Sequence, residues 1–309
     1  MDIKKILSKF SGFSNLNFLA TQVVEGQISG LHPSPFHGFS SEFAEHKTYN
    51  IGDNLKHVDW KLYGKTDKLF IKKFQDETNL RCHFILDTSS SMYYPKAQNT
   101  KNSFNKVGYS CLTIAYLMEL LKKQRDRFGL SLFNEDCDFF APERGNQRHF
   151  MNLLEMLEKT SLEIPKLQKT DIGSHLHKVS QKLQKRSMVV LFSDLMHPKK
   201  DLEAFFEGIN HLRHQQNEVI IFHTLDTQTE IDFQLGDEPK KLIDLETNES
   251  LTLFPDEYQK SYQEQTKQWL NEIKTLALKH KISYYHTDIQ KDFYKTITTF
   301  LNVREKNSK

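Results

Sequence analysis

The stretch Arg81-Cys82-His83-Phe84-Ile85-Leu86-Asp87-Thr88-Ser89-Ser90-Ser91 decides how the rest of the chain is interpreted. Its apolar centre is typical of a buried strand. Oxygen-bearing side chains follow at alternate positions, Asp87, Ser89 and Ser91. One carboxylate and two hydroxyls suit a hard cation such as Mg²⁺, and ligands gather at strand ends in open α/β sheets. A serine-rich turn that caps a helix has the same composition, so this stretch alone leaves both interpretations open.

Bulk properties predict an intracellular protein without a strong global charge. The chain has 309 residues and a formal net charge of +2. So small a charge excludes the strong positive electrostatic field that is typical of nucleic-acid or membrane binders. No apolar run approaches the ~18 residues that span a bilayer, and residues 1–17 do not have the pattern of a signal peptide. Of the three cysteines, Cys82 and Cys111 lie in apolar patterns. We therefore expect buried free thiols, a reducing compartment and a cytoplasmic location.

The N-terminal part, residues 1–78, is predicted to be a loop-and-strand module. Residues 1–30 indicate a short amphipathic helix and a mixed segment, and residues 32–77 show little helical periodicity. Alternating polar and apolar residues over 68–74 predict a strand that leads into the main sheet.

From residue 79 to 309, strand and helix patterns alternate, which predicts an α/β fold with a doubly wound, mostly parallel sheet. Acidic residues and prolines interrupt the alternation over about 226–256, where we expect an insertion containing a small β-hairpin. The remaining expected strands and helices are placed, in chain order, at 84–86, 107–121, 128–133, 148–160, 173–185, 188–192, 200–214, 219–222, 257–279, 282–285 and 290–303.

Two later features point back to the Asp87 turn. Thr170 lies in a loop just before an expected helix, and Asp194 ends the strongest strand pattern, as Asp87 ends the first. In a parallel sheet both aspartates project at the same edge. Each of these residues alone is explained as a helix cap or a turn residue. Together, the Asp87 turn, Thr170 and Asp194 predict a cavity lined by side-chain oxygen atoms.

This set resembles the metal-ion-dependent adhesion site (MIDAS) of von Willebrand factor A-like (vWA) domains, whose pattern is Asp-x-Ser-x-Ser, a later Thr and a later Asp. The resemblance implies direct coordination of Mg²⁺, or another divalent cation such as Mn²⁺, by Ser89, Ser91 and Thr170. It implies that Asp87 and Asp194 act largely through water, and that one coordination position is open to a carboxylate of a partner protein.

The upstream motifs resemble the signature of the bacterial DUF58 family. They are Gly38-Phe39-x-x-Glu42-Phe43, Lys47-x-Tyr49-x-x-Gly52-Asp53 and Val58-Asp59-Trp60-Lys61, and the closing Phe300-Leu301-x-x-Arg304 also fits. Lysines at 47, 56 and 61 stand where the family more often has arginine, and lysine cannot form a bidentate fork. The resemblance implies a non-enzymatic adaptor or chaperone-like partner of a MoxR-type AAA+ ATPase.

Three other functions are alternatives to this one. A phosphatase-like, metal-dependent hydrolase would use Asp87 and Asp194, but Ser89 stands where such enzymes carry a second aspartate as general acid. Binding of nucleic acid by the basic residues 65–73 is disfavoured because such a charge run is usually a solvated strand face. A Zn²⁺ site lacks a convincing set of ligands, although three histidines lie near the site: His175, His177 and His197.

Overall fold

The computed structural model describes most of the α/β region and part of the N-terminal segment. The described residues are 45–48, 60–73, 80–95, 104–133, 139–162, 172–196, 199–291 and 293–307.

The main sheet of the described chain has six strands in the order β10-β7-β6-β3-β4-β5. Neighbouring strands are parallel except β5, which runs antiparallel to β4. The strands are β3 (Arg81–Asp87), β4 (Arg127–Phe133), β5 (Phe139–Arg144), β6 (Met188–Ser193), β7 (Glu218–Leu225) and β10 (Ser283–Asp288).

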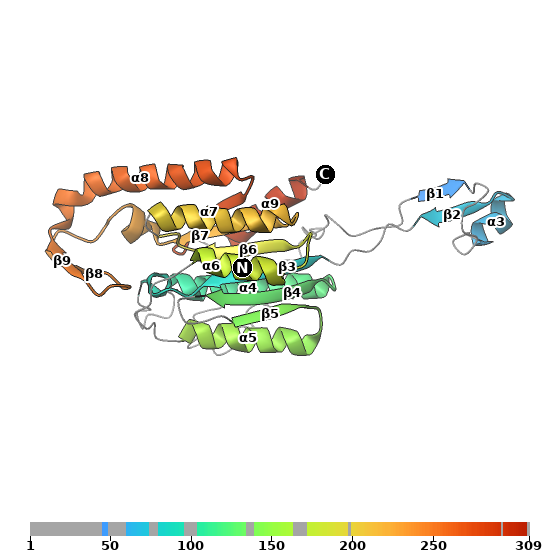
Figure 1. The fold of residues 1–309 in the computed structure, drawn as a ribbon, viewed down its shortest axis with the longest axis horizontal. Coiled ribbons are helices and arrows are strands. Elements are labelled where there is room, and N and C mark those ends of the chain that lie inside the picture. The colour runs from blue at the N-terminus through green and yellow to red at the C-terminus, as the bar shows by residue number, and fades with distance from the viewer. Residues whose placement is uncertain are drawn as a thin grey trace.

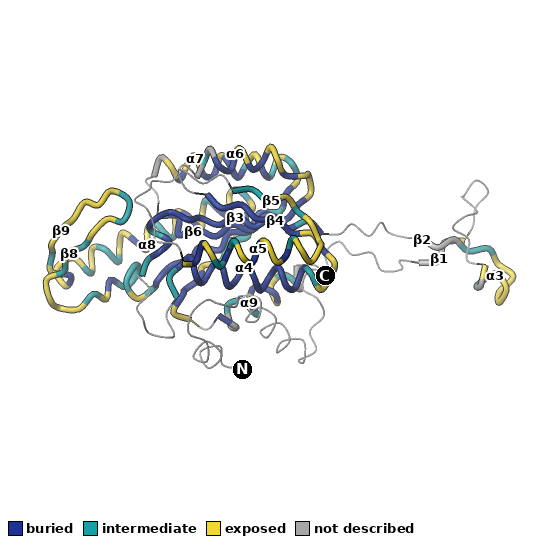
Figure 2. The backbone as a smooth tube through the Cα atoms, turned by 90° about the horizontal axis from the view of Figure 1, so that it is seen from below, coloured by how far each residue is buried: buried dark blue, intermediate teal, exposed yellow. Residues whose placement is uncertain are grey.

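Helices cover both faces of this sheet (Figure 1). They are α4 (Lys106–Lys123), α5 (Gln147–Leu162), α6 (Ile172–Lys182), α7 (Lys199–His214), α8 (Pro255–Lys279) and α9 (Phe293–Asn307). Figure 2 shows the strands buried between the helices, with α6 and α7 on one side and α4, α5 and α9 on the other. The expected doubly wound, mostly parallel α/β fold is confirmed.

The central strands read as continuous apolar runs because both of their faces are buried. On β3, Phe84 and Leu86 join the core that includes α4, α5 and α9, whereas Ile85 joins the core that includes α6, α7 and α8. On β6, Val190 and Val189 divide between the two cores in the same way.

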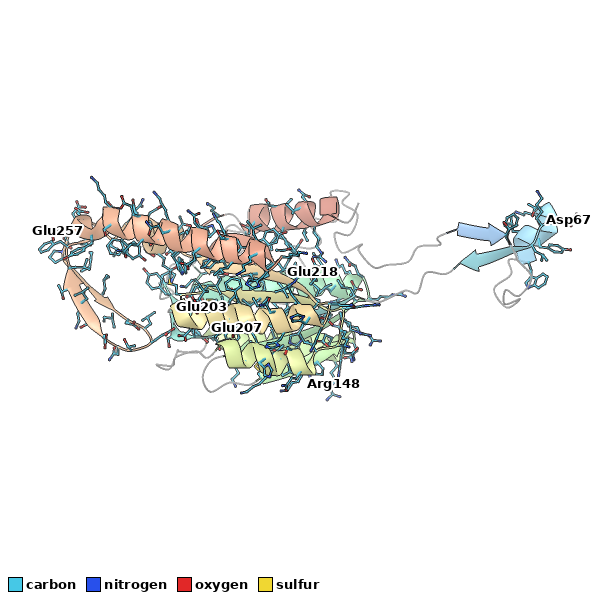
Figure 3. The ribbon with its side chains drawn as sticks, turned by 45° about the horizontal axis from the view of Figure 1, so that its top comes forward. Asp67, Arg148, Glu203, Glu207, Glu218 and Glu257 are labelled. Carbon is cyan, nitrogen blue, oxygen red and sulfur yellow. The ribbon has the colours of Figure 1, made fainter. Side chains whose placement is uncertain are left out.

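The outer helices carry charge on their solvent side. Glu203 and Glu207 of α7 are exposed and lie one turn apart, as Figure 3 shows. The last helix is fixed to the sheet by Arg304, whose guanidinium donates two hydrogen bonds, of 2.6 and 2.8 Å, to the carboxylate of Glu218 at the start of β7. This bidentate geometry is the strong form of an ion pair.

The expected hairpin within 226–256 is present as β8 (Lys240–Ile243) and β9 (Ser250–Leu253), which pair antiparallel. It follows a short π-helical segment, η3 (Thr227–Ile231). In Figure 1 the hairpin projects beside the start of α8, at the end of the sheet where β4 and β6 finish.

Three local features differ from the sequence expectation. The strand expected over 68–74 is β2 (Phe70–Lys73), but it pairs with β1 (Glu45–Thr48) in a separate two-stranded sheet and does not enter the main sheet. A helix, α3 (Trp60–Thr66), lies in the stretch without helical periodicity, because so short a helix leaves little pattern. Strand β5 was not predicted, because its pattern is half exposed and contains a proline.

Several expectations lie outside the described residues. These are the helix within 1–30, Cys137, and the domain boundary between 78 and 79. Cys82 and Cys111 are buried free thiols, as expected.

A buried polar contact fastens the edge strand β5 to the sheet. His83 of β3 is fully buried, and its Nδ1 lies 2.6 Å from Oε1 of Glu143 on β5. Its Nε2 lies 2.6 Å from Oγ of Ser131 on β4. The ring passes beneath Gly129, where an added Cβ would lie 2.7 Å from His83 Nδ1 and 2.6 Å from the Ala141 carbonyl oxygen. Burial alone raises the pKa of Glu143, but the hydrogen bond and charge of His83 outweigh burial and lower it.

We predict that Glu143→Gln lowers the free energy of unfolding at neutral pH by about 1–3 kcal/mol, because a charge-assisted hydrogen bond to a buried histidine is weakened. A lowered carboxyl pKa stabilises the fold above the pKa of the unfolded chain, and this stabilisation is lost as pH falls through the folded value. The difference between wild type and variant should therefore shrink below about pH 4. Urea unfolding at several pH values measures it. Glu155→Gln, at an exposed position of α5, is the control and should change little. A pH-independent difference would contradict the prediction.

Candidate functional site

The candidate site lies where the strand order of the main sheet reverses. From β3 the chain first adds β4 and β5 on one side, and then β6, β7 and β10 on the other. The carboxyl ends of β3 and β6 therefore border the topological switch point, where α/β sheets bind ligands. Asp87 ends β3, and Asp194 directly follows β6.

The Asp87 carboxylate is held by hydrogen bonds from both sides. Its Oδ1 accepts from the Ser89 backbone N–H at 2.9 Å, and its Oδ2 accepts from the Ser193 hydroxyl at 2.7 Å. The hydroxyl oxygens of Ser89 and Ser91 lie 3.1 Å apart. Asp87 and Ser89 are fully buried, and Ser91 is partly exposed. The structure thus brings the three predicted residues of this turn together.

Asp194 belongs to a buried ion triad that the sequence did not predict. Nζ of Lys106, the first residue of α4, lies 2.7 Å from Asp194 Oδ2 and 2.5 Å from Oε1 of Glu230 in η3. Asn105 caps this helix by accepting a hydrogen bond from the Gly108 N–H at 2.7 Å, which places Lys106 in the first turn, directed at the sheet edge. Asp194 Oδ1 accepts a further hydrogen bond, from the Met196 N–H at 3.2 Å.

The charges in the triad depend on one another. Burial alone lowers the pKa of Lys106, but the charges of Asp194 and Glu230 outweigh burial and raise it, so the ammonium stays protonated. Burial raises the pKa of Glu230, and Lys106 opposes that rise. A cation in the first turn of a helix is disfavoured by the helix dipole, so the two carboxylates are what keep this lysine in place.

A neutral histidine supports the backbone of Asp194. His223 of β7 is fully buried, and burial lowers its pKa to about 3. Its Nε2 lies 2.7 Å from the Asp194 carbonyl oxygen, which only accepts, so Nε2 carries the proton. Nδ1 then accepts from the Tyr284 hydroxyl at 2.6 Å. This fixed tautomer holds the loop after β6 at the switch point.

The donor set of the Asp87 turn fits a hard divalent cation in chemistry. It offers two hydroxyls and one carboxylate at alternate positions along the chain, and all of these donor atoms are oxygen. Asp194, in contrast, already shares its charge with Lys106. Thr170 lies outside the described residues, so its placement stays a prediction.

Nitrogen and sulfur ligands do not gather in the described part of the chain. No group of three or more His, Cys, Asp or Glu side chains is placed there to hold a metal ion. His175 is buried and stacks on Phe133, with ring centroids 4.9 Å apart, and His177 lies against His211. His197 is outside the described residues.

Sequence reasoning missed Lys106 and Glu230. One feature of the sequence could have indicated Lys106. It is a lysine directly before a long apolar helical pattern, in the first helical turn, where acidic residues are favoured. Glu230 lies in the insertion, 124 positions from Lys106, and no local pattern connects the two.

The comparison with protein families decides the membership of the chain. Residues 45–269 match the family described as "Protein of unknown function DUF58". The chain belongs to this family. The match begins at β1, so it includes the motifs at 47–53 and 58–61 but not those at 38–43 and 300–304, and it runs through most of the α/β region to Trp269 of α8.

The curated relatives of this chain are distant. An uncharacterized protein of Mycobacterium bovis and one of Mycobacterium tuberculosis are each 21% identical over 183 residues, which is 59% of this chain. The chain spans 56% of the length of these relatives.

Solved structures match this chain only at low identity. The conserved hypothetical protein BatB from Bacteroides thetaiotaomicron is 15% identical with a TM-score of 0.46, over 74% of this chain and 99% of its own. The VWA domain of SpRpn10 is 12% identical with a TM-score of 0.32, over 47% and 75%. At these identities and scores the likenesses assign no function to the DUF58 chain. Among its described residues, none of the helices is both long and apolar enough to cross a bilayer.

We predict that Lys106→Met lowers the free energy of unfolding by about 3–5 kcal/mol, because it leaves the carboxylates of Asp194 and Glu230 buried without their counter-ion. Adding Glu230→Gln should recover part of this loss, with a coupling energy of about 1 kcal/mol or more. Urea unfolding of the two single variants and the double variant measures the cycle. Lys123→Met, at an exposed position of the same helix, is the matched control. Strictly additive effects of the two substitutions would contradict the triad.

Proposed function

We propose that this DUF58 protein is a metal-dependent, non-enzymatic protein-binding module. The observation that carries the proposal is the Asp87 turn at the switch point, where the Ser89 and Ser91 hydroxyls lie 3.1 Å apart beside a carboxylate held by two hydrogen bonds. Such a set of hard oxygen donors suits Mg²⁺ or Mn²⁺.

In this proposal the residues have different tasks. Ser89 and Ser91, together with Thr170, hold the cation, and Asp87 supplies its negative charge beside them. Asp194 acts at longer range, since its Oδ2 is bonded to Lys106. When bound, the divalent ion supplies an open coordination position for a carboxylate oxygen. The surrounding loops supply specificity for the segment that bears this carboxylate.

The partner that we propose is a MoxR-type AAA+ ATPase, with the DUF58 protein as its adaptor. Support for this step is the family membership over residues 45–269 and the resemblance of the site to a MIDAS. The partner segment must present an aspartate, a glutamate or a terminal carboxylate.

We expect Ser89→Ala to weaken Mg²⁺ binding at least about tenfold, because one of few protein ligands is lost. Isothermal titration calorimetry measures this directly. Ser90→Ala is the matched control, since Ser90 stands between the two proposed ligands and should leave binding within about twofold. Equal affinities of wild type and Ser89→Ala would refute the assigned ligands.

In pull-downs of a MoxR-type ATPase from the same genome, recovery should need Mg²⁺ and fail with Ser89→Ala. Recovery that survives a chelator would refute the metal-dependent adaptor.

The alternative, a phosphatase-like hydrolase, makes a different prediction for the same protein. It requires metal-stimulated release of phosphate from generic phosphoesters, lost in Asp87→Asn. We expect no such turnover.

A further inference from the structure

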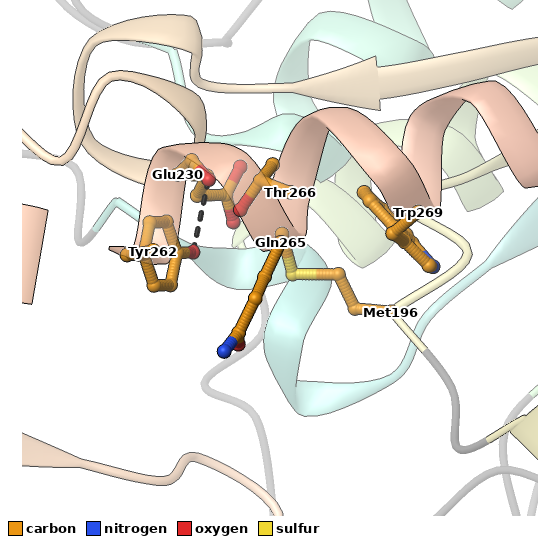
Figure 4. A pocket seen from close by; sticks show the side chains of 6 residues that line it. All are labelled: Met196, Glu230, Tyr262, Gln265, Thr266 and Trp269. Carbon is orange, nitrogen blue, oxygen red and sulfur yellow. Dashed lines mark hydrogen bonds between the residues drawn. The ribbon is translucent and has the colours of Figure 1, made fainter. Parts of the chain in front are cut away.

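A pocket of about 250 Å³ opens beside the candidate site. Four of its lining residues come from one face of α8, and the others come from the loop after β6 and from η3, as Figure 4 shows. The lining residues are Met196, Glu230, Tyr262, Gln265, Thr266 and Trp269.

The walls combine apolar, aromatic and polar side chains, and contacts to the candidate site hold three of them in place. The Tyr262 hydroxyl donates a hydrogen bond to the Glu230 backbone oxygen at 2.9 Å. The Trp269 ring meets the ring of His223 edge-on, with centroids 5.2 Å apart, and His223 in turn holds the Asp194 backbone. Met196 forms another wall, and its N–H donates to Asp194 Oδ1 at 3.2 Å. The pocket is therefore built in advance of any occupant.

The pocket is bordered by an excess of negative charge. Glu230 lines it, with 11% of its side chain exposed, and belongs to the buried triad. The two carboxylates of the triad at −1 each and the single ammonium at +1 leave a net charge of −1. Lys106 itself is fully buried, so it presents no positive charge to an occupant.

We infer that this pocket binds a cationic side chain, an arginine of the partner segment, next to the place where that segment's carboxylate meets the Asp87 turn. The aliphatic stem packs on Met196, and the planar guanidinium lies over the Trp269 ring on the side of Glu230. Cations over aromatic faces are attracted by the ring quadrupole. An apolar occupant would instead cover Glu230 without compensating the net charge.

The inference rests on the proposed function, because the arginine comes from the same partner segment as the carboxylate. It specifies a second residue that this segment must carry. A bound divalent ion is balanced by Asp87 and the partner carboxylate, so the charge of −1 on the triad remains for a second, basic side chain. The partner segment then carries an acidic and a basic residue a short distance apart.

Tryptophan fluorescence tests the pocket without the metal. The chain has two tryptophans, Trp60 and Trp269, and Trp60 lies in α3 of the N-terminal segment. In Trp60→Phe the signal therefore reports on the pocket alone. The probe is N-acetyl-arginine amide, titrated into the millimolar range in the presence of EDTA, with N-acetyl-norleucine amide as its apolar counterpart. We expect saturable binding of the arginine amide, at least about tenfold tighter than that of the norleucine amide.

Two substitutions at the exposed Gln265 sharpen the test without disturbing the core. Gln265→Lys should weaken binding of the arginine amide at least about threefold, and the matched Gln265→Glu should strengthen it. Absence of a saturable change, equal or tighter binding of norleucine amide, or equal affinities of the two Gln265 variants would each overturn the inference. Because EDTA is present throughout, these outcomes are independent of Mg²⁺ binding at the Asp87 turn, which the Ser89→Ala titration tests separately.

Discussion

The arrangement at the carboxyl edge of the sheet depends on one buried ammonium group, that of Lys106. It joins the start of α4 to the loop after β6 and to η3 through contacts of 2.7 and 2.5 Å. Without it, Asp194 and Glu230 would lie buried beside each other as like charges, which a protein interior does not tolerate. The insertion that follows β7 is thereby fixed to the core instead of forming an independent loop.

This ion triad divides the switch point into two parts with different chemistry. On one side lies the Asp87 turn, an all-oxygen set of hydroxyls and one carboxylate, suited to a divalent cation. On the other side lies the aromatic pocket under α8, bordered by the remaining negative charge of the triad. Asp194 links the triad to the pocket: its Oδ2 accepts a hydrogen bond from Lys106, and its Oδ1 accepts one from the Met196 N–H at the pocket wall. A partner that uses both parts would be selected by two charges of opposite sign, which favours specificity over affinity alone.

The sequence predicted the fold well where burial makes the pattern simple. The runs at Phe84–Leu86 and Met188–Phe192 are apolar throughout because both faces of β3 and β6 are covered, and both strands were located. The aspartates that end them were predicted to share one edge, and parallel pairing of β3 with β6 brings Asp87 next to Ser193 and hence near Asp194. Local patterns did not reveal the edge strand β5, because its side chains are half exposed, or the pairing of β2 with β1, because pairing partners are not encoded locally.

The unpredicted parts of the site share a cause. Lys106 and Glu230 become significant only through a contact across 124 positions, and the pocket joins Met196 to a face of α8 that begins far along the chain. In sequence, Glu230 is one acidic residue in an acidic insertion, and Trp269 is one aromatic residue in an amphipathic helix. Only tertiary contacts bring Glu230 and Trp269 into the site, and the periodicity of the sequence does not reveal such contacts.

The most direct test of the account is anomalous diffraction from crystals of the protein grown with Mn²⁺. The account predicts one strong manganese peak at the Asp87 turn, bonded to the hydroxyl oxygens of Ser89 and Ser91, with Lys106 still bonded to Asp194 and Glu230. A turn without manganese at a saturating concentration, or a manganese ion that takes the place of the Lys106 ammonium between those two carboxylates, would contradict it.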